Sequence, residues 1–234
     1  MATFSDHFGN IFESAAEAIV ITVNTVGVMG AGIALEASYR WPHVDASYQE
    51  ACRSKLIGPG KCQWLTADTK HVVLFPTKIH WRQPSTIQLV RAGMADLHSE
   101  ISRREITSIA MPHLGCSHGG LSWTSVRPIV VESLETISDL AVELWEFDPR
   151  FHDPLFARFR EYFTSLSEDS AMSWTSMSRA SVRTVTRALE DRNIVNFLLF
   201  RQTRGIGRDT ANKAYDAARS AASPSIQDSL FDDL

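Results

Sequence analysis

Cysteine is scarce in this sequence of 234 residues, which holds only Cys52, Cys62 and Cys116. An odd number of thiols without C-x-x-C spacing does not fit a disulfide framework or a structural zinc site. Long apolar runs are also missing, since no uninterrupted stretch approaches the length that spans a membrane. The residues from Met1 to His7 lack the basic segment and apolar core of a secretory signal. We therefore expect a cytoplasmic protein.

Neither sign of charge dominates, because 23 Lys and Arg residues stand against 27 Asp and Glu residues, for a formal net charge of -4. This balance excludes a chain that is coated uniformly with positive charge for nucleic acid. A hydrophobic content of 44% and a charged content of 21% are typical of a globular protein. The length accommodates an ordinary domain and a smaller one.

The first 150 residues alternate between two hydrophobic patterns. Runs of apolar, β-branched residues predict strands, and apolar residues three or four positions apart predict helices. Strands that alternate with helices indicate a layered α/β domain with helices on both faces of one sheet. The expected strands span 17–23, 62–66, 71–75, 106–111 and 140–147, and the expected helices lie near 31–40, 46–54, 86–104 and 123–137.

The pattern changes near residue 150, where Asp148-Pro149 and Asp153-Pro154 follow the last expected strand. We expect a first domain over 1–149, a small, mainly α-helical region over 150–222 and a flexible tail over 223–234. Two amphipathic stretches, Pro154 to Leu166 and Ser178 to Glu190, are expected to form helices in this region.

Basic residues outnumber acidic ones by nine to four between 179 and 219. Arg179, Arg183 and Arg187 share one helical face, which is typical either of a solvated surface or of contacts with a phosphate backbone. Residues 203–214 resemble the hairpin of helix-hairpin-helix DNA-binding motifs, although the apolar-Pro pair before the glycines is missing. The alternative for that segment is an ordinary helix cap.

The most informative stretch runs from Val23 to Ala34 and reads VNTVGVMGAGIA. An apolar run precedes it and a helix start follows, so the glycine-rich segment joins a strand to a helix. Backbone N–H groups at the positive end of a helix bind diphosphate well. The glycine spacing matches neither a dinucleotide-binding fold nor a P-loop. A tight turn with a purely structural role is the alternative.

Two further segments share this character. Residues 108–123, SIAMPHLGCSHGGLSW, again run from an apolar strand through a glycine loop to a helix, and FPTKIHW at 75–81 ends a strand with Lys78. Together with Asn24 and GVMGAG, and in this order, these motifs resemble the macrodomain family over roughly residues 1–148. Within it they resemble the branch of the DNA ADP-ribosyl glycohydrolase antitoxins (DarG-like) and the terminal ADP-ribose glycohydrolases. The resemblance implies a three-layer α/β/α fold with a mixed sheet.

It further implies that ADP-ribose lies across the two glycine loops without a cofactor. Lys78 and Asn24 are the expected catalytic residues: Asn24 orients the distal ribose, and Lys78 stabilises charge on the departing base or attacks the opened sugar. A surface lysine at a strand end is the alternative for Lys78. Asn10 matches the position that reads adenine. The other expected ADP-ribose-binding residues are Ile11, Gly27, Val28, Met29, Gly30, Ala31, Gly32, Thr77, Gly115, Cys116, Ser117, His118, Gly119 and Gly120.

The chain departs from the family pattern at three positions. Ile21 replaces the first residue of a paired-asparagine signature, and Ala31 stands where lysine is common, which weakens diphosphate binding. Gly119 stands where the terminal ADP-ribose glycohydrolases carry a catalytic aspartate. The glycine version resembles the antitoxin branch, which removes ADP-ribose from thymidine bases of DNA. The histidines and cysteine of this loop do not predict a metal site, because the loop is expected to present its backbone to phosphate.

We therefore interpret the chain as an ADP-ribosyl glycohydrolase that acts on nucleobases of DNA, with thymidine the expected base and a cognate DNA ADP-ribosyltransferase toxin the expected partner. A non-catalytic ADP-ribose-binding module and a toxin-sequestering interaction protein are the alternatives. At the end of the chain, QDSLF resembles the short peptide with which bacterial proteins bind the replication sliding clamp, through Gln227, Leu230 and Phe231. The alternative is that Leu230 and Phe231 fold back onto the protein.

Overall fold

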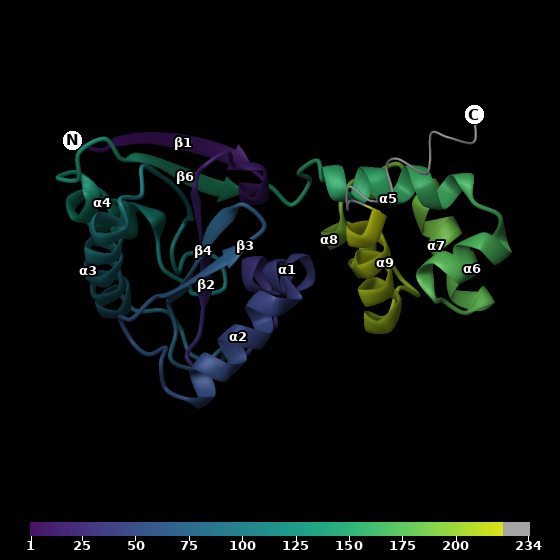
Figure 1. Ribbon diagram of the computed structural model, residues 1–234, viewed down its shortest axis with the longest axis horizontal. Helices are drawn as coiled ribbons and strands as arrows, with labels where there is room; N and C mark the ends of the chain where they lie inside the picture. The colour runs from purple at the N-terminus through teal and green to yellow at the C-terminus, as the bar shows by residue number, and fades with distance from the viewer. Residues whose placement is uncertain (222–234) are drawn as a thin grey trace. The chain divides into compact units, whose positions relative to one another are not determined.

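A mixed six-stranded sheet organises the first part of the chain in the order β1-β6-β5-β2-β4-β3 (Figure 1). Five strands run parallel, and only β3 pairs antiparallel, with β4 at one edge. The α/β class and the mixed sheet that the resemblance implies are thereby confirmed. The strands are β1 (Thr3–Gly9), β2 (Ala18–Val23), β3 (Gln63–Ala67), β4 (Lys70–Pro76), β5 (Ser108–Pro112) and β6 (Ala141–Phe147).

Helices cover both faces of this sheet: α1 (Gly32–Arg40) and α2 (Pro42–Arg53) on one, α3 (Ile87–Arg104) and α4 (Trp123–Leu134) on the other, with the 3-10 helix η1 (Ile11–Glu13) after β1. Alternate residues of β2 reach opposite layers, because the side-chain period of a strand is two. Ala18 and Val20 belong to the core with α3 and α4, and Ile19 and Ile21 belong to the core with α1 and α2. A strand that is buried on both faces reads as a continuous apolar run, which is why the sequence predicts it well.

The expected strands agree with β2 to β6 within two residues. Helix α2 begins earlier than expected, because Pro42 occupies its first turn, where a missing N–H costs nothing. The sequence does not predict β1, whose residues are mainly polar and lie at the edge of the sheet.

The computed structural model describes residues 1–221, which divide into one compact unit over Met1–Phe147 and a second that begins at Asp148. The second unit is helical, as expected, and its helices pack around stacked aromatic rings such as Phe197 and Tyr215, whose centroids are 3.9 Å apart. Its helices are α5 (Pro154–Ser165), α6 (Glu168–Thr175), α7 (Arg179–Glu190), α8 (Phe197–Gln202) and α9 (Arg208–Ala221).

The clamp-binding peptide predicted at Gln227, Leu230 and Phe231 lies outside the described residues and stays a prediction. Across residues 1–221, the structure contains no helix with the length and apolar character needed to cross a membrane.

Candidate functional site

Three loops leave the sheet at the same edge. The first glycine loop (24–31) follows β2, the lysine segment (77–82) follows β4, and the second glycine loop (113–120) follows β5. Because β5, β2 and β4 are parallel neighbours, their carboxyl ends meet, and such an edge is where open α/β sheets bind ligands. The structure therefore brings the two glycine loops and Lys78 together.

The lysine segment is bonded to both glycine loops. Lys78 Nζ donates a hydrogen bond to the carbonyl oxygen of His118 at 2.6 Å. On the other side, the Thr25 backbone N–H and hydroxyl both donate to the carbonyl oxygen of Ile79, at 3.1 and 2.9 Å. Lys78, a half-buried residue, is thus bonded to the second glycine loop, unlike an ordinary surface lysine at a strand end.

A buried asparagine shapes the first glycine loop from within. Asn24 is only 6% exposed, and its Nδ2 donates to the carbonyl oxygen of Val28 at 2.7 Å while its Oδ1 accepts from the Val26 N–H at 3.0 Å. The Tyr48 hydroxyl of α2 lies 2.8 Å from the Asn24 carbonyl oxygen and 3.0 Å from Oδ1. Burial raises the pKa of Tyr48 far above its usual value, so the hydroxyl keeps its proton as a donor. The side chain of Asn24 therefore fixes the loop that is expected to hold ligand.

The first glycine loop leads into the start of α1 with its backbone open to solvent. Gly30, Ala31 and Gly32 are exposed, and Ala31, the N-cap residue, makes no side-chain hydrogen bond to the first turn. The positive end of α1 is therefore left for an external anion. At Gly32, a Cβ would lie 3.3 Å from Cδ2 of His118, so the two glycine loops approach each other closely there.

Glycine is a steric requirement at the centre of the second glycine loop. A Cβ at Gly119 would lie 2.1 Å from the carbonyl oxygen of Gly115 and 2.3 Å from Oγ of Ser85. The Ser85 N–H donates to the Gly119 carbonyl oxygen at 2.9 Å, and the buried Ser85 hydroxyl has no hydrogen-bond partner among residues 1–221. This loop shape admits no side chain at 119, so the missing aspartate has a packing cause.

His113 and Cys116 of the second glycine loop each contact a different partner. His113 stacks on Trp123 with ring centroids 3.9 Å apart, and burial lowers the pKa of His113. Cys116 Sγ donates to the carbonyl oxygen of Leu114 at 3.4 Å, and burial raises the pKa of Cys116. Within residues 1–221, no group of three His, Cys, Asp or Glu side chains is arranged to hold a metal ion.

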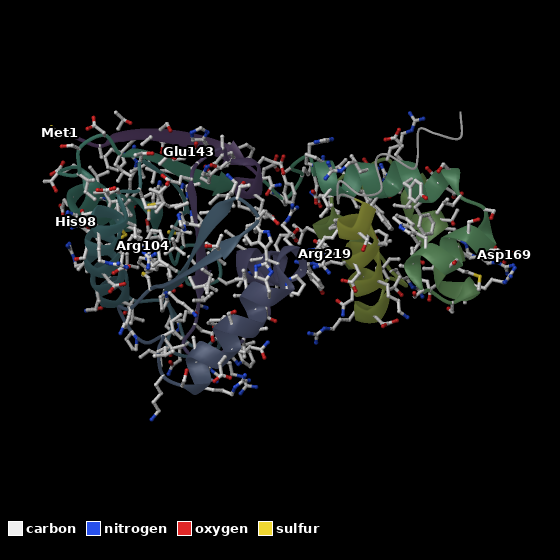
Figure 2. The ribbon with its side chains drawn as sticks, viewed as in Figure 1. Met1, His98, Arg104, Glu143, Asp169 and Arg219 are labelled. Atoms are coloured by element: carbon white, nitrogen blue, oxygen red, sulfur yellow. The ribbon has the colours of Figure 1, made fainter. Side chains whose placement is uncertain are left out.

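Asn10, the expected adenine-reading residue, precedes η1, which begins at Ile11. The Asn10 side chain caps η1 by accepting a hydrogen bond from the Phe12 N–H at 3.2 Å, and Ile11 is buried in the same core cluster as residues of α1. The Ser14 hydroxyl at the end of η1 donates at 2.5 Å to Glu143, a β6 residue labelled in Figure 2. These contacts fix the segment, and the side-chain oxygen of Asn10 accepts a hydrogen bond from the protein itself.

The other residues expected to bind ADP-ribose differ in exposure. Thr77 and Met29 are buried, whereas Val28, Ser117 and Gly120 are exposed. The three loops and the strands before them, residues 18–35, 69–95 and 106–131, contain no Asp or Glu. The edge therefore offers backbone N–H groups and an ammonium without a competing carboxylate from these segments, which suits a diphosphate.

Sequence reasoning missed two residues that support this edge, Tyr48 and Ser85. The spacing of Tyr48 in α2 identifies it only as a core residue, because its hydroxyl meets Asn24 through tertiary packing. Ser85 precedes the cap of α3 and carries no sequence signal for its position between Gly115 and Gly119.

The arginine stripe of the second unit is largely engaged in ion pairs. Arg179 pairs with Glu168 at 2.8 Å and with Asp169, labelled in Figure 2, at 2.6 Å. Arg183 pairs with Glu168 at 3.0 Å. These pairs favour the solvated-surface interpretation for two of the three arginines, since a phosphate would have to displace carboxylates.

Comparisons with known proteins identify a family model and several relatives that resemble part of this chain. The family model described as "Macro domain" matches residues 20–130. A DNA ADP-ribosyl glycohydrolase of Thermus aquaticus is 39% identical over 145 residues, which are 60% of this chain and 40% of that protein. A DNA ADP-ribosyl transferase-DNA ADP-ribosyl glycohydrolase fusion protein of Thermosipho africanus is 31% identical over 156 residues, 58% of this chain and 40% of that protein.

Among solved structures, the macrodomain of Thermus aquaticus DarG matches with a TM-score of 0.60 and 36% identity, over 62% of this chain and 99% of that one. The chain spans about two fifths of the length of the curated relatives named above.

Proposed function

The chain belongs to the macro domain family through its first unit, and from that premise we propose that it is a glycohydrolase that removes ADP-ribose from nucleobases of DNA. The observation that carries the proposal is the position of Lys78, whose ammonium donates to the His118 carbonyl oxygen of the second glycine loop at 2.6 Å, while the next residue, Ile79, is bonded to Thr25 of the first glycine loop. A module that only binds ADP-ribose needs the loops but does not need a cation at their junction.

In this proposal the diphosphate rests on backbone N–H groups at the start of α1 and in the second glycine loop, and the distal ribose faces Lys78. The reaction breaks the bond between the anomeric carbon and the base nitrogen, whose electron pair leaves with the base. Water adds its oxygen to the anomeric carbon, and its proton is delivered to the base. The Lys78 ammonium stabilises the negative charge that develops on the departing base.

We propose thymidine as the modified base from the family resemblance, and two features support DNA as the substrate. Both relatives described above are named as DNA ADP-ribosyl glycohydrolases, one of them as a fusion with a transferase. Gly119 leaves no room for the aspartate expected in enzymes that act on protein-linked ADP-ribose. We further propose an antitoxin role toward a DNA ADP-ribosyltransferase, supported by the relative in which transferase and glycohydrolase are fused.

The test uses two substrates, an oligonucleotide carrying ADP-ribose on thymidine and a protein carrying ADP-ribose on glutamate. The wild-type chain should release ADP-ribose from the first and act weakly on the second. Lys78→Ala should abolish release yet bind free ADP-ribose within about tenfold of wild type, near 1.4 kcal/mol. Lys61→Ala, which removes an exposed lysine outside the three loops, is the matched control. Full turnover by Lys78→Ala would contradict the mechanism, and equal rates on both substrates would contradict the preference for DNA.

One observation favours the alternative of a binding module. Asn24, expected to orient the ribose, uses its side chain to hold the first glycine loop. Calorimetric binding of ADP-ribose by the wild-type chain, with no release from either substrate, would establish that alternative.

A further inference from the structure

Exposed apolar side chains gather beside Lys78. Val26, Val28, Ile79 and Trp81 are 43%, 39%, 49% and 44% exposed, and we call these four residues the apolar rim. The rim joins two loops, because Thr25 donates two hydrogen bonds to the carbonyl oxygen of Ile79. The rim therefore borders the candidate site on the side of the first glycine loop and the lysine segment.

Trp81 is held in a defined setting. The Arg82 guanidinium carbon lies 4.3 Å from the centroid of its ring, and the His80 ring stacks at 5.4 Å with an interplanar angle of 26°. The turn that carries it is closed by bonds to His80, from the Arg82 N–H to Nδ1 at 3.2 Å and from the Gln83 N–H to the carbonyl oxygen at 2.9 Å. The guanidinium covers one face of the indole, and the exposed part of the ring is suited to stack with a further flat ring.

The charge around Trp81 selects an anionic partner. Lys78 and Arg82 lie within three residues of Trp81 in the sequence, and residues 69–95 contain no carboxylate. Nucleobases stack on aromatic side chains while basic side chains follow the phosphates, and this combination of contacts is typical of single-stranded nucleic acid sites. An acidic peptide would use the cations but leave the apolar rim without a partner.

We propose that the apolar rim binds single-stranded DNA next to the modified nucleotide, with Trp81 as the stacking platform for a neighbouring base and Arg82 beside its phosphate. The proposal rests on the proposed function and adds how the strand, as distinct from its ADP-ribose, is recognised. An enzyme that acts on a base needs that base outside the duplex stack, so its neighbours are also available for stacking.

The experiment compares two substrates that share the reacting bond, a modified single-stranded oligonucleotide and the ADP-ribosylated thymidine nucleoside. Trp81→Ala should lower kcat/KM on the oligonucleotide by about tenfold, the size of one base–aromatic stack, and leave the nucleoside unaffected. Trp81→Phe should recover most of the loss. Leu56→Ala, which removes an exposed apolar side chain outside the rim and the three loops, should match wild type on both substrates.

Equal losses of Trp81→Ala on both substrates, or no loss on the oligonucleotide, would overturn the proposal. Fluorescence anisotropy with an unmodified labelled oligonucleotide keeps the test independent of turnover, because Trp81→Ala should weaken that binding even if the wild-type chain hydrolyses nothing. A variant that binds the oligonucleotide like wild type but loses a purified transferase would assign the rim to a protein partner and overturn the DNA contact.

Discussion

The two glycine loops keep their shapes by different physical means. The first is held by polar side chains, since Asn24 bonds the loop backbone and Tyr48 supports Asn24 from α2. The second is held by close packing, since Gly119 leaves no space for even a methyl group between Gly115 and Ser85. A loop that is fixed by hydrogen bonds tolerates added volume at its exposed positions, whereas a loop that is fixed by packing tolerates loss of a polar group but not an added carbon.

The largest effect is expected at Gly119. Gly119→Asp should abolish measurable ADP-ribose binding and destabilise the first unit by about 3 kcal/mol, because overpacking of this severity forces the backbone to move. Thermal unfolding and calorimetric titration measure the two effects. Ser117→Asp places the same charge at an exposed position of the same loop and should retain nearly all the stability. An unchanged melting temperature for Gly119→Asp would show that the loop is not fixed by packing.

A smaller loss is expected at Asn24. Asn24→Ala removes both the acceptor and the donor that hold the first glycine loop, which should cost about 2 kcal/mol and weaken ADP-ribose binding. Asn24→Asp keeps the acceptor for the Val26 N–H but cannot donate to the Val28 carbonyl oxygen, so its stability should be intermediate or lower. Chemical denaturation provides the comparison, and wild-type stability in Asn24→Ala would mean that the loop holds its shape without this side chain.

Tyr48→Phe removes only the hydroxyl that supports Asn24 and should cost about 1 kcal/mol at neutral pH. Because the folded-state pKa of Tyr48 is raised, folding favours the neutral phenol, and this stability is lost as the pH rises above the ordinary tyrosine value of about 10. The stability difference between wild type and Tyr48→Phe should therefore shrink in alkaline solution. A difference that stays constant from neutral to strongly alkaline pH would contradict the hydrogen-bond role.

The smallest effect, with the opposite sign, is expected at Ser85. Its buried hydroxyl has no hydrogen-bond partner in the part of the chain that the structure describes, so Ser85→Ala should leave stability unchanged or raise it by less than about 1 kcal/mol. Ser85→Thr adds a methyl group to the same crowded position and should destabilise. If Ser85→Ala instead weakens ADP-ribose binding without changing stability, the hydroxyl is a ligand contact.

The sequence indicates where the candidate site lies, but not which side chains support its two glycine loops. Glycines that follow apolar strands predict both loops, and Lys78 at the end of the strand between them completes the group. The supports escape prediction because they come from distant parts of the chain: Tyr48 belongs to a helix that packs below the first loop, and Ser85 to the segment before α3. Asn24 carries a family signature, yet only the folded chain shows that its side chain is engaged by the loop itself.

The sequence does not predict strand β1 for a related reason. Its residues are mainly polar and form no apolar run, and its partner β6 lies at the far end of the unit in sequence. A pattern confined to a few neighbouring residues cannot report a pairing of that kind.

That pairing also sets an order of events during synthesis. Thr3 pairs with Ala141 and Gly9 with Phe147, so β1 has no strand partner until almost the whole first unit has left the ribosome. Contacts between residues so distant in sequence form slowly, because the intervening chain must be ordered before they contribute. A nascent chain halted before residue 141 therefore contains both glycine loops and Lys78, but one edge of its sheet is unpaired. The lifetime of that unpaired edge determines how long the protein depends on protection from aggregation.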